Sequence, residues 1–171
     1  DHDTAEMAVQ AALTGHLVFS TLHTNDAPSA VTRLLDLGVP PFLLSSTLLG
    51  VMAQRLVRTL CPHCKKPTDP PDDETWRAIT SPWRAEKPAQ VMAPVGCVEC
   101  RMTGYRGRIG LYEIMLMTPA IRKLVTAAVD DAGIREQAYK EGMKPLRVSG
   151  AMKVAAGSTT ADEVVKVAPL G

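Results

Sequence analysis

Near the start of the chain, apolar residues at helical spacing are followed by a continuous apolar run. Residues 3–6, Asp-Thr-Ala-Glu, resemble a capping box, and the apolar residues after them share one helical stripe that ends at Gly15. Residues 17–22, Leu-Val-Phe-Ser-Thr-Leu, lack that spacing and predict a buried β-strand. A polar cluster follows the strand directly: His23, Thr24, Asn25 and Asp26.

Three more elements are predicted before the first cysteine. A helix with Pro28 in its first turn has Asn25 or Asp26 as its capping residue. Pro40 and Pro41 interrupt the helix, and residues 42–47 after them predict a short helix at best. Residues 51–59 predict a strand whose arginines suit a sheet rim, either beside an anionic ligand or partner, or simply in solvent.

The chain beyond residue 70 is mainly helical. Residues 72–80 predict one short helix in a proline-rich insert, and residues 109–116 predict a strand. Four further helices are predicted over residues 118–129, 130–142, 145–156 and 161–167. The class is therefore α/β with a small helical carboxyl-terminal subdomain. A helix feeding one strand cannot form a sheet alone, so we expect a piece of a larger sheet.

Two histidines lie at the ends of the predicted strand. At about 3.3 Å per residue, the step from His16 to His23 covers roughly 23 Å, and an odd step places the two side chains on opposite faces. Ligands of open α/β sheets bind beyond the carboxyl ends of the strands, where His23 lies. His23 is therefore the first candidate for a site residue and His16 a weaker one. The ordinary alternative is a histidine that only satisfies hydrogen bonds inside the fold.

Composition narrows the class of protein. The 171 residues carry a net charge of +1 and 4% aromatic residues, which argues against wholesale nucleic-acid binding. The longest weakly polar run, residues 42–53, is too short to span a bilayer. With no sign of secretion, four cysteines favour a metal site over disulfides, and we expect a cytoplasmic protein.

The cysteines form two C-x-x-C pairs, Cys61 with Cys64 and Cys97 with Cys100, separated by 32 residues. Four thiolates at about 2.3 Å complete a tetrahedral structural zinc site with no open position. A free or redox-active dithiol is the alternative, although neither pair opens a helix in a thioredoxin-like context. His63 is expected to be a bystander. We expect the insert between the pairs to be a surface excursion without chemistry.

Several segments carry a family resemblance. Residues 1–5 look like the end of an Arg-Asp-x-Glu-Thr-Ala segment, and residues 14–27 look like a histidine box. Residues 54–58, Gln-Arg-Leu-Val-Arg, the tetracysteine pattern and residues 104–113 match the same family. Across its whole length the chain resembles the traffic ATPases of bacterial type II secretion and type IV pilus assembly. Retraction ATPases of that superfamily generally lack the four cysteines, so the resemblance favours the secretion or assembly branch.

The resemblance implies a partial RecA-like (P-loop NTPase) sheet with a tetracysteine zinc knuckle and a small helical subdomain. Residues 1–60 correspond to the end of the ATPase core, residues 61–108 to the knuckle with its insert, and residues 109–171 to a return strand and the helical subdomain. Such motors form homo-hexamers at the cytoplasmic face of the bacterial inner membrane. Their partners are the membrane platform proteins of the secretion or pilus system, and no nucleic acid is implied.

The resemblance also implies roles for single residues. His23 and His16 correspond to catalytic positions, where His23 would orient the γ-phosphate or pair with the Walker B glutamate. Asp1, Thr24 and Arg55 correspond to positions that bind ATP with Mg²⁺. The structural Zn²⁺ ligands are Cys61, Cys64, Cys97 and Cys100.

Two departures matter. A P-loop needs a Gly-Lys pair to hold the phosphates, yet no lysine of this chain follows a glycine. The Walker B carboxylates, the aspartate box and the arginine fingers would lie upstream of Asp1, so we expect a carboxyl-terminal fragment that is inactive alone. Asp3 replaces the glutamate usual in the family, which is a conservative change at a capping position.

The competing hypothesis is a zinc-knuckle module that binds nucleic acid. It would use a cationic patch of Arg55, Arg58, Lys65, Lys66, Arg101, Arg106 and Arg108. The scarcity of aromatic residues near these cations and the histidine box both argue against it.

Overall fold

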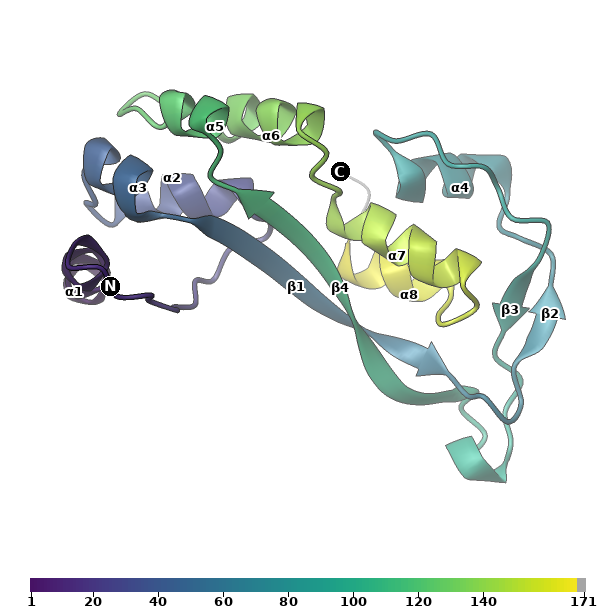
Figure 1. Ribbon diagram of the computed structural model, residues 1–171. Helices are drawn as coiled ribbons and strands as arrows, with labels where there is room; N and C mark the ends of the chain where they lie inside the picture. The colour runs from purple at the N-terminus through teal and green to yellow at the C-terminus, as the bar shows by residue number, and fades with distance from the viewer. Residues whose placement is uncertain (169–171) are drawn as a thin grey trace. The chain divides into compact units, whose positions relative to one another are not determined.

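The computed structural model describes residues 1–168 of the chain (Figure 1). In chain order its elements are α1 (His2–Leu13), α2 (Pro28–Asp36), α3 (Pro41–Thr47), β1 (Gly50–Leu60), β2 (Lys66–Thr68), α4 (Asp73–Thr80), β3 (Val91–Ala93), η1 (Val98–Cys100), β4 (Tyr105–Leu116), α5 (Pro119–Leu124), α6 (Asp131–Lys140), α7 (Leu146–Ala155) and α8 (Ala161–Val167). The expected mixture of helices and strands is confirmed. No helix of the described residues is long and apolar enough to cross a bilayer.

The strands form two pairs. β1 pairs with β4, and the two strands run in opposite directions because Met117 N donates to Leu49 O at one end while Cys61 N donates to Gly104 O at the other. β2 pairs antiparallel with β3, with Pro67 opposite Met92. Because β1 leads into the first cysteine pair and β4 begins just after the second, the longer strand pair delivers both cysteine pairs to the same end.

The chain forms two compact units, and each is discontinuous in sequence. The first unit combines residues 1–53 with residues 113–144, and the second combines residues 54–112 with residues 145–168. The division falls within both β1 and β4. Residues distant in sequence therefore complete the core of each unit.

The first unit is a helical layer over the strand ends. α2 packs against α3 and α6, and α5 contacts both α3 and α6. Its fully buried apolar side chains include Val31, Leu44, Met115, Ile121 and Ile134. The Arg122 side chain on α5 donates to the carbonyls of Met117 (2.8 Å), Leu48 (3.0 Å) and Ser45. It therefore satisfies carbonyl groups at the end of α3 that the helix itself leaves unpaired.

The second unit builds its core from α4, α7 and α8, which contact one another. Gly150 on α7 permits the close approach of α8, because a Cβ there would lie 2.4 Å from a methyl group of Val164. Trp76 and Ile79 on α4 are buried, and the Trp76 indole donates to Ala85 O at 3.0 Å. The insert between the cysteine pairs is thus part of this core, and the expectation of a mere surface excursion is wrong.

Several predicted boundaries move by a few residues. α1 begins at His2 because the side chain of Asp1, and not that of Asp3, accepts a hydrogen bond from Thr4 N. β4 begins at Tyr105, four residues before the predicted strand, and α5 ends at Leu124. The short pair β2 and β3 was not predicted, because three-residue strands carry too little periodicity to detect.

Candidate metal centre and histidine segment

The four cysteine sulfurs converge on one point. The Sγ–Sγ distances are 3.9 Å for Cys61 and Cys97, 3.8 Å for Cys64 and Cys100, and 3.7 Å for Cys97 and Cys100. All four sulfurs lie within 4.8 Å of one another, and none forms a disulfide. A regular tetrahedron with bonds of about 2.3 Å has sulfur–sulfur edges of about 3.8 Å. The cluster therefore has the dimensions of a structural zinc site.

Backbone amides point at two of these sulfurs. Gly96 N donates to Cys64 Sγ at 3.3 Å, while Cys97 N and Gly104 N each donate to Cys100 Sγ at 3.2 Å. Burial opposes ionisation of Cys100, but the two amides, together with hydrogen bonds from the Cys97 and Cys64 thiols, outweigh it and lower the pKa of the Cys100 thiol to about 6. Burial raises the pKa of Cys97 to about 11. A bound dication deprotonates such thiols, so metal binding would release protons here.

The turn around the second pair depends on left-handed backbone. Arg101 and Met102 have φ values of 51° and 61°, and Gly104 has 76°. A Cβ at Gly104 would lie 2.5 Å from Pro94 Cβ, so this position requires glycine. Outside the metal cluster, Lys65 Nζ donates to Gly157 O at 2.8 Å and ties the module to the segment before α8. His63 is exposed and lies outside the cluster.

The histidine segment, residues 14–27, differs from the structure predicted for it. Residues 17–22 form no strand and are exposed, with Leu17 at 67% and Phe19 at 88%. An apolar run becomes a buried strand only where a neighbouring strand pairs with its backbone, and within the described residues no strand does so. The prediction of a buried strand here is wrong, although the polar cluster after the run remains.

The two histidines lie in different surroundings. His16 Nδ1 is 3.0 Å from Thr14 Oγ1 and 3.3 Å from Ala11 O, so His16 closes the end of α1. His23 is exposed, and Thr24 Oγ1 donates to Asp26 O at 3.2 Å. The structure does not bring these two histidines into one cluster within the described part of the chain.

The other residues predicted to bind nucleotide, Asp1 and Arg55, form hydrogen bonds with residues close to them in sequence. Asp1 caps α1 through its bond to Thr4 N (2.8 Å), and Arg55, in the second unit, donates to Gln54 O at 2.9 Å. The nucleic-acid hypothesis loses part of its cationic patch in the same way. Arg58 forms an ion pair with Glu163, and Arg106 lies 3.4 Å from Glu99. These contacts leave less positive charge available for phosphates.

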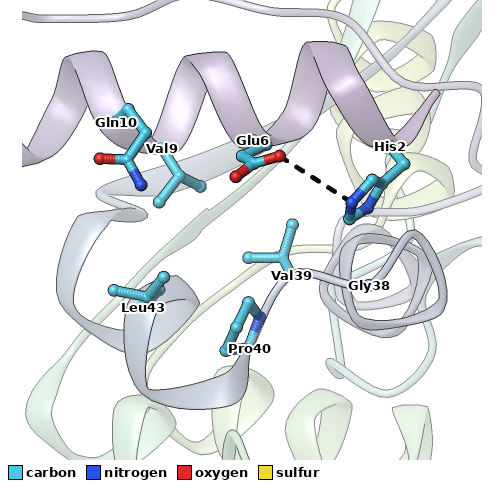
Figure 2. A pocket seen from close by; sticks show the side chains of 8 residues that line it. All are labelled: His2, Glu6, Val9, Gln10, Gly38, Val39, Pro40 and Leu43. Atoms are coloured by element: carbon cyan, nitrogen blue, oxygen red, sulfur yellow. Dashed lines mark ion pairs between the residues drawn. The ribbon is translucent and has the colours of Figure 1, made fainter.

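The first unit also contains a mostly apolar pocket of about 210 Å³ between α1 and the turn after α2 (Figure 2). Val9, Val39 and Leu43 are among its lining residues, and His2 and Glu6 lie 4.0 Å apart at its side. None of the predicted nucleotide or metal residues lines it in the described part of the chain.

Sequence reasoning missed two buried acids, Glu113 on β4 and Glu163 on α8. Glu113 accepts the Ala27 N–H at 2.8 Å, and Glu163 receives Arg58. A signal for Glu113 was present, because Leu111 and Met115 lie two positions away on either side and every second residue of a strand shares one face. For Glu163 the sequence contains no comparable signal.

A solved structure shares this fold. The crystal structure of the pilus retraction motor PilT with bound ADP aligns with 99% of this chain and 37% of its own, with a TM-score of 0.61 and 23% identity. The likeness confirms the expected mixed helix and strand fold, and the four cysteine sulfurs lie close enough to form the expected tetracysteine module.

Sequence comparison then gives the family. The family model described as type II/IV secretion system protein matches residues 1–166. The chain is 54% identical over 170 residues to the type IV pilus assembly ATPase TfpB of Acinetobacter baylyi, covering 99% of this chain and 29% of the relative. It is 46% identical over 167 residues to the type II secretion system ATPase E of Vibrio cholerae, covering 98% of this chain and 32% of the relative. The chain therefore belongs to the type II/IV secretion system protein family and spans about a third of such relatives.

Proposed function

We propose that this chain is the carboxyl-terminal portion of a motor that couples ATP hydrolysis to pilus or pseudopilus assembly and protein export. The observation that carries the proposal is the family match over residues 1–166, in relatives that are named secretion and pilus-assembly ATPases. The motor is a homo-hexamer at the cytoplasmic face of the bacterial inner membrane, and it works on membrane platform proteins.

The nucleotide role falls on the histidine segment. His23 orients the γ-phosphate of ATP or pairs with a Walker B carboxylate, and Thr24 and Arg55 contribute to binding ATP and Mg²⁺. Asp1 and His16 act through the ends of α1, which is where their hydrogen bonds lie. The absence of any Gly-Lys pair from residues 1–171 supports the view that the P-loop belongs to another part of the motor.

The zinc role falls on Cys61, Cys64, Cys97 and Cys100. Their sulfur spacing supports a closed tetrahedral Zn²⁺ site that stabilises the fold and takes no part in hydrolysis. In functional terms, residues 1–60 complete the ATPase core, residues 61–108 form the knuckle, and residues 109–171 return the chain to a helical subdomain.

Steady-state ATPase rates test the proposal. The full-length motor is expected to hydrolyse Mg-ATP, while the isolated chain is not, because phosphoryl transfer depends on the P-loop lysine and the Mg²⁺ carboxylates. In the full-length motor, His23→Ala is expected to lower turnover by about 10²-fold with a smaller change in ATP affinity. His16→Ala is the matched control and should lose stability together with activity. Turnover by the isolated chain, or a normal rate in His23→Ala, contradicts these roles.

A further inference from the structure

Side chains from β4 and α6 hold the chain immediately after His23. Ala27 N donates to Glu113 Oε1 at 2.8 Å, and Asp26 Oδ2 accepts from Arg135 Nη2 at 2.9 Å. Glu113 and Arg135 lie 86 and 109 residues away in sequence from their partners, yet both belong to the same compact unit as His23. Two long-range contacts therefore meet within four residues of this histidine.

The Glu113 contact is buried on both sides. Ala27 has no exposed surface, and Glu113 is 3% exposed. The Ala27 amide precedes α2 and has no partner inside that helix, so without Glu113 it would be a buried donor without an acceptor. The contact fixes a main-chain atom, which constrains the path of the chain more directly than a contact between side chains.

The Arg135 contact fixes the preceding residue. Asp26 Oδ1 accepts from Ser29 N at 2.9 Å and also from the Ser29 hydroxyl, so one carboxylate oxygen caps α2 while the other receives Arg135. Asp26 and Arg135 are 22% and 38% exposed, so this pair is partly shielded from solvent. Asp26 is thus held from its own helix and from α6.

Within the part of the chain that the structure describes, the segment before His23 has no comparable long-range contacts. Residues 17–22 are exposed and form no strand with the described residues. Among residues 1–168, the long-range contacts that fix the chain next to His23 therefore lie on its carboxyl-terminal side, at Asp26 and Ala27.

We propose that Glu113 and Arg135 are positioning residues that place His23 for the hydrolytic step. This inference rests on the role of His23 under the proposed function. A displacement of about 1 Å in a group that acts at the reacting phosphate can cost up to about 10²-fold in rate. Loss of either anchor acts on the rate through His23, without any contact to nucleotide.

The experiment uses the full-length motor with Glu113→Ala, Glu113→Gln and Arg135→Ala. Glu113→Ala and Arg135→Ala are expected to lower kcat by about tenfold or more with KM nearly unchanged. Glu113→Gln keeps an oxygen that accepts the Ala27 amide and should recover most of that rate. Asp131→Ala is the matched control: Asp131 accepts from Thr32 Oγ1 at 2.7 Å, so its loss weakens the packing of α6 on α2 without touching Asp26 or Ala27.

A double-mutant cycle with His23→Ala separates positioning from general stability. If the anchors act through His23, Glu113→Ala and Arg135→Ala have little further effect on kcat once His23 is removed. Full additivity overturns the inference, as does a kcat loss in Asp131→Ala equal to that of the anchors. Arg135 is partly exposed, so Arg135→Ala serves where Glu113→Ala does not fold. Normal turnover in His23→Ala overturns the proposed function of His23, whereas impaired His23→Ala with normal anchor variants overturns only the anchoring.

Discussion

The ion pair between Arg58 and Glu163 links β1 to α8 in the second unit, and its removal should destabilise that unit in a pH-dependent manner. Arg58 Nη2 lies 2.6 Å from Glu163 Oε1 and Arg58 Nε lies 3.0 Å from Oε2, so the guanidinium binds the carboxylate with two parallel bonds. Lys166 Nζ adds a bond of 2.9 Å, and the guanidinium lies 4.0 Å from the centre of the Tyr105 ring. The Glu163 side chain is only 7% exposed.

The size of the effect follows from the titration of Glu163. The bonds from Arg58, with help from Lys166, outweigh burial and lower the pKa of Glu163 from 4.5 to about 2. At 1.36 kcal/mol per pKa unit this difference corresponds to about 3 kcal/mol. Arg58 is 48% exposed, and solvent screening reduces the value, so we expect about 2 to 3 kcal/mol. Because the folded-state pKa is lowered, this stability is present above pH 4.5 and is lost as the pH falls toward 2.

Denaturant unfolding of wild type and Glu163→Gln, followed by circular dichroism, measures the effect. At pH 7 the variant is expected to unfold with a free energy about 2 to 3 kcal/mol smaller, and by pH 3.5 about two fifths of that gap should be gone. Both proteins contain the same cysteines, so loss of zinc at low pH affects both alike. Glu136→Gln removes an exposed acid 2.7 Å from Lys140 and should show no comparable gap. A gap that stays constant between pH 7 and 3.5, or no gap at pH 7, refutes the reasoning.

Two further predictions concern the tetracysteine module. Purified protein should contain one zinc per chain, and Cys64→Ser should unfold residues 61–108 while sparing the histidine segment, because structural zinc contributes on the order of 10 kcal/mol; less than half an equivalent of zinc by metal analysis contradicts this. In the full-length motor, joint replacement of Arg106 and Arg108 by alanine should impair secretion or piliation more than basal ATP turnover, because both side chains are exposed beside the knuckle and the Arg106 contact with Glu99 is an exposed one that water screens. Loss of nucleotide affinity with normal partner binding would show the opposite.

The features that could be predicted from sequence are those in which nearby residues satisfy one another. Asp72 accepts from Thr75 N and Thr118 from Ile121 N, as residues at helix starts do, so α4 and α5 begin where their capping residues indicate. The cysteine cluster was predictable for a related reason. Each C-x-x-C turn brings two sulfurs together locally, and only the meeting of the two turns depends on the fold.

The features that could not be predicted depend on distant partners. Residues 17–22 have the side-chain pattern of a strand, but pairing depends on a neighbouring backbone that the pattern does not describe. The prediction for the insert between the cysteine pairs was wrong because a polar pattern concealed residues that pack in the core. Its prolines and charges are typical of a surface loop, while Trp76 and Ile79 supply enough apolar surface to pack α4 against α7 and α8.

One local sequence feature does indicate a distant partner, and that feature is an acidic residue within an apolar stripe. Burying a carboxylate is costly unless hydrogen-bond donors come with it, so a position such as Glu113, between Leu111 and Met115 on one strand face, requires a donor from another segment. In this chain the donor is the main chain at Ala27, four residues after His23. The alternation of β4 thus indicates that Glu113 accepts a hydrogen bond from a distant segment. That segment contains His23, on which the proposed chemistry depends.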